Sequence, residues 1–459
     1  MSEGKVSIQF LGAAGTVTGS KHLLKTPEKN ILIDCGLFQG LKTLRLRNWD
    51  SLPVSVDTIN LVILTHAHLD HCGYLPLLIK AGYKGQILMS APTRDLVEII
   101  LRDSAKIQEE DADHANRHGY TKHKPAKPLY TLADVEQTIP HFVTHTDKEW
   151  ITITDNIKFR FLKNGHILGS CFIDMQCYGK KFVFSGDIGR EHSELLYPPT
   201  IIEEADYLIM ESTYGDRLHP TTSIQNDLAA IINTTIQKNG NIVIPSFAVG
   251  RAQELMHIIN ALKKENHIPN IPVYMDSPMG ADVLSIMERY PEWHKLSAKE
   301  YTAMCNDVTV VRDYHETDRI IQNKESKIII AASGMITGGR VLEYLKHYVG
   351  NKKNTVVLVG YQAAGTRGRA LQEGAHEIKL HGKYFMVNAY VRTISSLSGH
   401  GDQAEMINWL RQFKKKPEKI FLVHGEPMAQ DIFRTKIKDE IHVEVEIPQQ
   451  GEKTTLFTV

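Results

Sequence analysis

The sequence predicts an α/β protein with two or three domains, one of them a doubly wound parallel sheet. Its 459 residues are more than one hydrophobic core usually serves. Between residues 223 and 360, short apolar strands alternate with amphipathic helices, which is the pattern of a parallel sheet covered on both faces. On either side of this stretch, strands end instead in short loops that carry histidine, aspartate and glycine.

The part before residue 215 is expected to contain mainly strands joined by glycine turns. Strands are expected over 6–11, 22–25, 31–34, 61–64, 87–90, 182–185 and 207–211, with two more in 151–162 and helices over 75–80 and 93–109. The glycine-rich residues 12–19 lead into a strand and lack the G-x-G-x-x-G spacing, so they predict a loop and not a dinucleotide site. Residues 110–149 are expected to be a solvated helical excursion, whose His114, His118 and His123 bind no metal.

The doubly wound domain is expected over 215–392. It should contain helices over 223–238, 248–264, 279–290 and 340–349, and strands over 241–245, 272–276, 308–312, 327–332 and 355–360. Residues 393–459 return to the style of residues 1–214, with a helix over 403–413 and strands over 419–423, 443–447 and 454–459.

Composition excludes several classes of protein. Lys+Arg and Asp+Glu both number 53, so net charge predicts no nucleic-acid or membrane partner, and any nucleic-acid surface must be a local basic groove. The five cysteines form no C-x-x-C, which argues against a disulfide framework and a cysteine-bound zinc. Without an apolar N-terminal signal region or an 18-residue apolar run, a cytoplasmic protein that crosses no membrane is expected.

A metal site is predicted directly after the strand at 61–64. There the chain reads His66-Ala67-His68-Leu69-Asp70-His71. Neutral imidazoles and carboxylates are zinc ligands, and four of them fall within six residues. The alternative, a histidine-rich surface loop, does not explain why the cluster follows a buried strand so abruptly.

Further candidate ligands stand at other strand ends. Asp34 ends a strand, His166 lies in a glycine-flanked loop, and Asp187 stands between Gly186 and Gly189. Glycines allow close approach of the backbone at such positions. Three more motifs follow a strand or precede a helix: Glu211 in E-S-T-Y-G, His400 in S-G-H-G-D and His424 in L-V-H-G-E.

The H-x-H-x-D-H spacing resembles the metallo-β-lactamase superfamily. The remaining motifs, in this order, are similar to its β-CASP branch, nucleic-acid-processing enzymes that include the mRNA 3′-end endonuclease subunit and its prokaryotic relatives. The resemblance implies an αββα metallo-β-lactamase sandwich, made of residues 1–214 and 393–459, into which a β-CASP domain of residues 215–392 is inserted. It places the active site in the cleft between them.

The resemblance also assigns roles to the motif residues. It gives His66, His68 and His166 to one zinc ion and Asp70, His71 and His424 to a second, with Asp187 bridging both and Asp34 orienting the metal-binding loop. Asp70, Glu211 and His400 are the expected catalytic residues, with His400 as general acid supported by Glu211. Two zinc ions per chain are expected, and manganese stays open because the same ligands accept it.

The implied activity is hydrolysis of phosphodiester bonds in single-stranded RNA, internally, leaving 5′-phosphate and 3′-hydroxyl ends. His424 at the last motif favours RNA over DNA, although a DNA nuclease, a thioester or lactam hydrolase and a non-catalytic RNA-binding subunit remain alternatives. No KH-type extension before the hydrolase domain is expected, so RNA selectivity is expected to come from the cleft or from partners. A homodimer or an RNA-processing complex stays open.

Phosphate-binding groups are expected in the doubly wound domain, because ligands of such sheets bind beyond the carboxyl ends of the strands. Backbone N–H groups and arginine forks suit phosphates. The alternative is that the glycines mark turns and the arginines solvate the surface. The candidate residues are Ser246, Arg251, Ser333, Gly334, Gly339, Arg340, Arg367 and Arg369.

Overall fold

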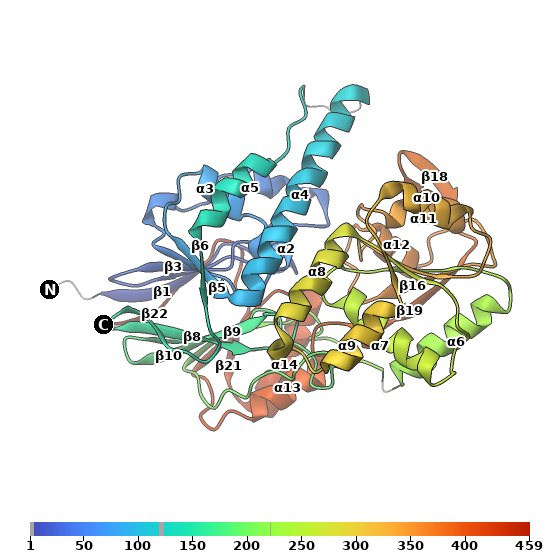
Figure 1. The fold of residues 1–459 in the computed structure, drawn as a ribbon. Coiled ribbons are helices and arrows are strands. Elements are labelled where there is room, and N and C mark those ends of the chain that lie inside the picture. Colours follow the sequence, from blue (N-terminus) through green and yellow to red (C-terminus); the bar gives the residue numbers. More distant parts are fainter. Residues whose placement is uncertain (1–3, 119–123, 221) are drawn as a thin grey trace. The chain divides into compact units, whose positions relative to one another are not determined.

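The computed structural model describes residues 4–118, 124–220 and 222–459 (Figure 1). Contacts divide the chain into two compact units. The first comprises residues 1–191, 198–218 and 400–459, and the second comprises residues 192–197 and 219–399. Each unit is built around sheets of its own. No helix within the described ranges is long and apolar enough to cross a membrane.

The described residues of the first unit form two seven-stranded sheets. In the first sheet the order is β22-β1-β2-β3-β4-β5-β6, and the strands from β3 to β6 run parallel. Strand β4 in its interior is Leu-Val-Ile and fully buried, as expected for a parallel strand covered on both faces. The bounds are β1 (Lys5–Phe10), β2 (His22–Lys25), β3 (Asn30–Ile33), β4 (Leu61–Ile63), β5 (Gln86–Ser90), β6 (Phe142–His145) and β22 (Lys453–Thr458).

The second sheet has the order β21-β20-β11-β10-β9-β8-β7. Its half from β10 to β21 is parallel, and its half from β7 to β10 is an antiparallel meander. The bounds are β7 (Ile151–Thr154), β8 (Ile157–Lys163), β9 (Cys171–Cys177), β10 (Lys180–Phe184), β11 (Tyr207–Glu211), β20 (Lys419–Val423) and β21 (Glu444–Glu446).

The two sheets pack face to face with helices outside. Phe10 of the first sheet meets Phe421 of the second with ring centroids 5.2 Å apart, and Tyr207 stacks on Phe457 at 6.1 Å. On the outer face of the first sheet lie α3 (Leu75–Lys80), α4 (Ala91–His118) and α5 (Leu132–Thr138), and on that of the second lie α13 (Gln403–Arg411) and α14 (Pro427–Ile441) (Figure 1). The expected αββα sandwich is confirmed.

The second unit contains the expected parallel sheet. Its described strands have the order β14-β13-β15-β12-β16-β19, all parallel, and β15 reads Ile-Ile-Ile-Ala with every residue buried. The strands of this sheet are β12 (Ile242–Pro245), β13 (Val273–Asp276), β14 (Thr309–Val311), β15 (Ile328–Ala331), β16 (Thr355–Val359) and β19 (Tyr390–Ile394), and β17 (Glu377–Leu380) and β18 (Lys383–Met386) form a separate antiparallel hairpin. The helices are α6 (Ile224–Ile236), α7 (Arg251–Lys264), α8 (Pro278–Arg289), α9 (Ala298–Asn306), α10 (Tyr314–Gln322), α11 (Val341–Tyr348) and α12 (Arg367–Gln372).

Some elements differ from the sequence prediction. Within residues 110–149, α4 continues to His118 and β6 pairs parallel with β5, so this stretch is partly built into the sandwich. His114 and His118 share the exposed end of α4, where the His118 ring contacts the His114 carbonyl at 3.0 Å; His123 lies outside the described residues. Strand β9 was not predicted because Asp174 interrupts its apolar run. That carboxylate is buried and forms an ion pair of 2.8 Å with Arg160 on the neighbouring strand β8.

Candidate metal centre and its catalytic neighbours

The metal-binding turn begins where β4 leaves its sheet. Leu64 N still donates to Leu88 O of β5 at 2.9 Å, and the chain then turns into α2 (Leu69–Cys72), a single helical turn. The neighbouring segment lies so close that a Cβ on Gly36 would meet Asp70 O at 1.6 Å, so a side chain at this glycine would push the turn away. The sequence at the strand end thereby places His66, His68, Asp70 and His71 together.

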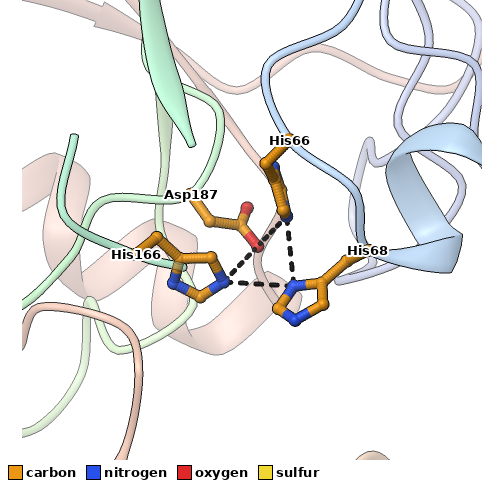
Figure 2. Close-up of side chains that lie close together, drawn as sticks. All are labelled: His66, His68, His166 and Asp187. Carbon is orange, nitrogen blue, oxygen red and sulfur yellow. Dashed lines mark hydrogen bonds and ion pairs between the residues drawn. The ribbon is translucent and has the colours of Figure 1, made fainter. Parts of the chain in front are cut away.

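One cluster consists of three histidines and Asp187 (Figure 2). His68 Nδ1 lies 3.1 Å from His66 Nε2 and 3.1 Å from His166 Nε2. One carboxylate oxygen of Asp187, Oδ2, lies 3.4 Å from each of those two Nε2 atoms. The four side chains come from the turn after β4, the loop after β8 and the loop after β10.

These spacings fit a tetrahedral metal ion. With Zn–N bonds of about 2.0–2.1 Å, two ligands of a tetrahedral zinc lie about 3.3 Å apart. The four contacts above measure 3.1–3.4 Å. A single Nδ1–H of His68 would satisfy one of its two imidazole contacts as a hydrogen bond, whereas a shared cation would account for both. The donor set of three imidazoles and one carboxylate suits zinc or manganese.

A second cluster consists of Asp70, His71 and His424. Asp70 Oδ2 lies 3.4 Å from His424 Nε2. The other oxygen of Asp187, Oδ1, faces this cluster, 3.2 Å from His71 Nε2 and 3.5 Å from the His424 ring. Among the described residues, Oδ1 is buried without a hydrogen-bond donor. A buried carboxylate oxygen in that state is what a bridging ligand between two metal ions requires.

Asp34 determines which ring nitrogen of His66 and His71 carries the proton. Its carboxylate accepts hydrogen bonds from Thr65 N and from His71 Nδ1, each at 2.8 Å, and from Thr65 Oγ1 at 2.8 Å. Because the Thr65 hydroxyl donates to Asp34, it accepts from His66 Nδ1, 3.0 Å away. Both histidines then carry their proton on Nδ1 and present an unprotonated Nε2 to the cluster.

His424 is held in the same way from the second sheet. The Thr213 hydroxyl donates to His424 O at 3.1 Å and accepts from His424 Nδ1 at 3.1 Å. This leaves Nε2 of His424 facing Asp70. The residue follows β20 with a φ of +49°, a left-handed conformation that turns its side chain back over the sheet end.

Burial sets the charge of the ligands. It lowers the pKa of His166 well below its ordinary value and that of His68 to about 3, so both are neutral and able to bind metal. Burial opposes ionisation of Asp187, but the surrounding imidazoles of His424, His71 and His66 hold its pKa well below the usual range. The first cluster therefore combines neutral nitrogen donors with an ionised carboxylate. In the second cluster burial opposes protonation of His71, but the Asp187 and Asp34 carboxylates raise its pKa well above the ordinary value, so a metal ion bound there would displace a proton from this ring.

Glu211 and His400 form a pair beside the first cluster. His400 Nδ1 donates to the Glu211 carboxylate at 3.0 Å, and its ring lies against His166 with centroids 4.5 Å apart. Glu211 is fully buried at the end of β11 and also accepts from Ile188 N. Burial opposes protonation of His400, but the Glu211 and Asp187 carboxylates outweigh it and raise its pKa to about 8.

The predicted phosphate-binding arginines all lie in the second unit and have acceptors within it. Arg251 contacts Glu254 and donates to Leu397 O at 2.9 Å, and Arg367 donates to Lys379 O at 2.6 Å. Arg369 pairs with Glu373 at 2.6 Å and is one-third exposed.

Arg340 is bound most completely. It pairs with Asp276 at 2.8 Å and donates to Thr317 Oγ1 at 3.0 Å and to Arg312 O at 2.8 Å. Asp276 is fully buried and also accepts from the Tyr344 hydroxyl at 2.7 Å.

The remaining candidates are loop residues at the strand ends. Ser246 Oγ donates to Phe247 O at 3.1 Å, and Ser333 Oγ accepts from Thr337 N at 3.0 Å. Gly339 has a φ of +77°, and a Cβ on Gly334 would lie 2.6 Å from the Phe247 ring, so both glycines are required by the backbone itself. Their contact with phosphate stays a prediction.

The sequence prediction missed three residues of the site. Thr65 orients His66, which follows it in T-H-A-H, so a hydroxyl next to a predicted ligand was the available signal. Thr213 lies in E-S-T-Y-G but orients His424, 211 positions away, so no local signal was available for it. His22 lines a small cavity of about 10 Å³ together with His71 and His424 of the second cluster, and burial lowers its pKa to about 3. Its position in a strand gave no such signal.

Three stretches of the chain match described families. Residues 19–224 match the metallo-beta-lactamase superfamily, residues 252–371 the Beta-Casp domain, and residues 384–448 the Zn-dependent metallo-hydrolase RNA specificity domain. A crystal structure of a protein of unknown function from Enterococcus faecalis has a similar fold, with a TM-score of 0.54 and 12% identity over 98% of this chain and 100% of that one.

Several characterised proteins are similar along most of the chain. Ribonuclease TTHA0252 of Thermus thermophilus is 33% identical over 90% of this chain and 92% of its own length. An RNase J-like protein of Methanocaldococcus jannaschii is 32% identical over 97% of this chain and 99% of its own. Transcription termination factor FttA of the same archaeon is 34% identical over 92% of this chain, which covers 67% of that factor.

Proposed function

We propose that this chain, which belongs to the β-CASP family of the metallo-β-lactamase superfamily and is a metal-dependent hydrolase, is a ribonuclease that cuts single-stranded RNA internally. The observation that carries the proposal is Asp187, whose two oxygens face two separate ligand clusters, as a two-metal phosphodiesterase requires. Similarity to Ribonuclease TTHA0252 and to an RNase J-like protein supports RNA as the substrate.

The two clusters would each hold one metal ion, and zinc is the proposed metal. The donors of the first would be His66, His68, His166 and Asp187, and those of the second Asp70, His71, His424 and Asp187. When bound, such ions provide a nucleophile at neutral pH and neutralise charge on the phosphoryl oxygens. Asp34, Thr65 and Thr213 keep the imidazoles in the tautomer that this requires.

His400 is the proposed general acid. Glu211 accepts the Nδ1 proton and stabilises the imidazolium, so His400 is largely protonated near neutral pH. As the bond between phosphorus and O3′ breaks, Nε2 would transfer its proton to the leaving O3′. Proton transfer to this oxygen yields a 3′-hydroxyl on one product and leaves the phosphate on the 5′ end of the other.

The test is cleavage of a 5′-labelled single-stranded RNA and of its DNA counterpart by the purified, zinc-loaded chain. We expect internal cuts in RNA. The downstream product should carry a 5′-phosphate, which a phosphatase removes. Asp187→Asn should lose metal and cleavage together, because the amide can bridge no pair of cations. His347→Ala, on an exposed histidine of α11, is the matched control and should cut like the wild type.

Two results would count against this function. Equal cleavage of RNA and DNA would show that the chain is a nuclease without preference for RNA, not a ribonuclease. Absence of cleavage of both polymers, with both metals bound, would favour a substrate other than nucleic acid or a non-catalytic RNA-binding role.

A further inference from the structure

A short surface segment of the first unit, residues 41–49, is unusually rich in exposed cations and apolar groups. Lys42, Arg45 and Arg47 are exposed, and none of the three has an ion-pair partner among the residues that the structure describes. The apolar side chains between them are exposed as well: Leu41 by 46%, Leu46 by 50% and Trp49 by 57%. The segment contains no carboxylate, so it carries a charge of +3 on a chain whose net charge is zero.

The segment is held firmly at its base. Asn48 is its buried residue, and its amide accepts from Phe38 N at 2.9 Å and donates to Phe38 O at 2.8 Å. The buried ammonium of Lys21 lies over the rings of both Phe38 and Tyr74, 4.7 and 4.8 Å from their centroids. The exposed side chains therefore project from a fixed base, which lowers the entropy that a ligand must overcome.

Both ends of the segment are attached to the metal-binding turn. Before it, Leu37 N donates to Leu69 O at 3.0 Å; after it, Asp50 O accepts from the Tyr74 hydroxyl at 3.1 Å. Leu69 begins and Tyr74 follows the turn that carries Asp70 and His71. An open groove of about 520 Å³ is lined by Tyr74 and by residues that begin at Ser51, two positions after Trp49. A polymer bound at the metal centre thus has this surface beside it.

We propose that residues 41–49 bind the single-stranded RNA that flanks the scissile bond, an inference that rests on the proposed function. Lys42, Arg45 and Arg47 contact phosphates, and one base stacks on the Trp49 ring. Unpaired cations interleaved with an exposed aromatic side chain are the chemistry that binds single strands without sequence preference. Protein interfaces also favour arginine and tryptophan. Three cations without a carboxylate within nine residues favour a polyanion instead, because each contacted phosphate releases a counterion.

The test measures RNA binding directly, by fluorescence anisotropy of labelled oligo(U) with the full chain. It is done in a His400→Ala background, which slows cleavage of the probe, with oligo(U) of about 16 and about 4 nucleotides, the two ends of the range of single-strand site sizes. Trp49→Ala is compared with Trp49→Phe, which keeps a ring. A triple variant Lys42→Ala, Arg45→Ala, Arg47→Ala is compared with Lys84→Ala, Lys127→Ala, Lys148→Ala, which removes three other exposed cations.

Trp49→Ala should weaken binding of the long probe roughly 5- to 150-fold, the usual loss of one stacked base, and Trp49→Phe should largely retain it. The triple variant should lower the slope of log affinity against log salt by about 2, since each contacted phosphate of a single strand contributes about 0.7. The ratio of long-probe to short-probe affinity should fall in both. The control triple variant should leave slope and ratio unchanged.

If Trp49→Ala and the triple variant both keep the wild-type affinity for the long probe, the proposal that residues 41–49 bind RNA is wrong, even where the wild type cuts RNA. Loss of affinity in a chain that cuts no RNA supports the surface and rejects the proposed cleavage, because binding is read without cleavage. Equal binding of polyglutamate and oligo(U) by the segment would assign it to acidic polymers such as a protein partner, and would overturn RNA as its ligand.

Discussion

Replacing Asp34 by asparagine tests how one buried carboxylate keeps the histidines of the turn ready to bind metal. The substitution preserves shape and removes the charge. Asp34 has a φ of +59°, a conformation that asparagine tolerates well, so the backbone should not change. The carboxylate accepts from Thr65 N and Oγ1 and from His71 Nδ1. An amide has one acceptor oxygen and so cannot keep all three bonds.

The expected loss follows from that hydrogen-bond count. If the amide oxygen stays on Thr65 N, the NH₂ group takes the place of Oδ2 and faces His71 Nδ1 at 2.8 Å, donor against donor. The imidazole then moves its proton to Nε2, the atom that lies 3.2 Å from Asp187 Oδ1. Loss of a hydrogen-bond partner of a metal-binding histidine typically lowers metal affinity 10–100-fold, or by about 1.4–2.7 kcal/mol.

The assay is metal content after dialysis against increasing concentrations of a chelator, measured by mass spectrometry. Asp34→Asn should lose one of two metal ions at roughly 10–100-fold less chelator than the wild type, and cleavage should fall with it and return in excess metal. Asp50→Asn, on an exposed aspartate nearby, should behave as the wild type. If Asp34→Asn kept both ions with wild-type affinity, the tautomer argument for His71 would be refuted.

Three further predictions concern other parts of the chain. His400→Ala should retain both metal ions but slow single-turnover cleavage on the order of 10²–10⁴-fold; loss of metal would instead make His400 a ligand. Burial lowers the pKa of Lys21 from 10.5 to about 8, so between these pH values the unfolded chain binds more protons and stability rises with pH, by up to about 3 kcal/mol. Lys21→Met should abolish that rise in urea unfolding, and an unchanged pH dependence would contradict it. Arg340→Ala should destabilise the second unit by about 3–5 kcal/mol, because the Asp276 carboxylate would remain buried and unpaired; weaker RNA binding at unchanged unfolding midpoint would instead restore Arg340 as a phosphate ligand.

The candidate site was largely predictable because its residues follow one rule. Ligands stand directly after apolar strands: His66 after β4, His166 after β8, Asp187 after β10 and His424 after β20. The strands β8, β10 and β20 run in the same direction in the second sheet, so their ends lie at one edge of it. The turn after β4 joins them from the first sheet, and this last step depends on how the two sheets pack. The parallel sheet of the second unit was predictable for a similar reason, since continuous apolar runs separated by helical segments leave few alternatives.

Side-chain partners were not predictable in the same way. Arg251, Arg340 and Arg367 satisfy the sequence criteria for phosphate binding, yet their acceptors come from residues up to 146 positions away. Asp174 prevented the prediction of β9, because the residue that neutralises its charge, Arg160, lies on another strand. Local sequence specifies which groups a segment offers, whereas pairing depends on which distant segment packs against it.

The sequence by itself determined the fold class of this protein, most of its strands and the candidate ligands, because strand-end chemistry and apolar periodicity are local. Only the tertiary structure decided that Asp187 turns one oxygen to each cluster, and that Thr65 and Thr213 orient the imidazoles. It also decided that Leu41, Leu46 and Trp49 are exposed. Solvent exposure and hydrogen-bond geometry arise from contacts between segments far apart in the chain, and a local pattern carries no record of them.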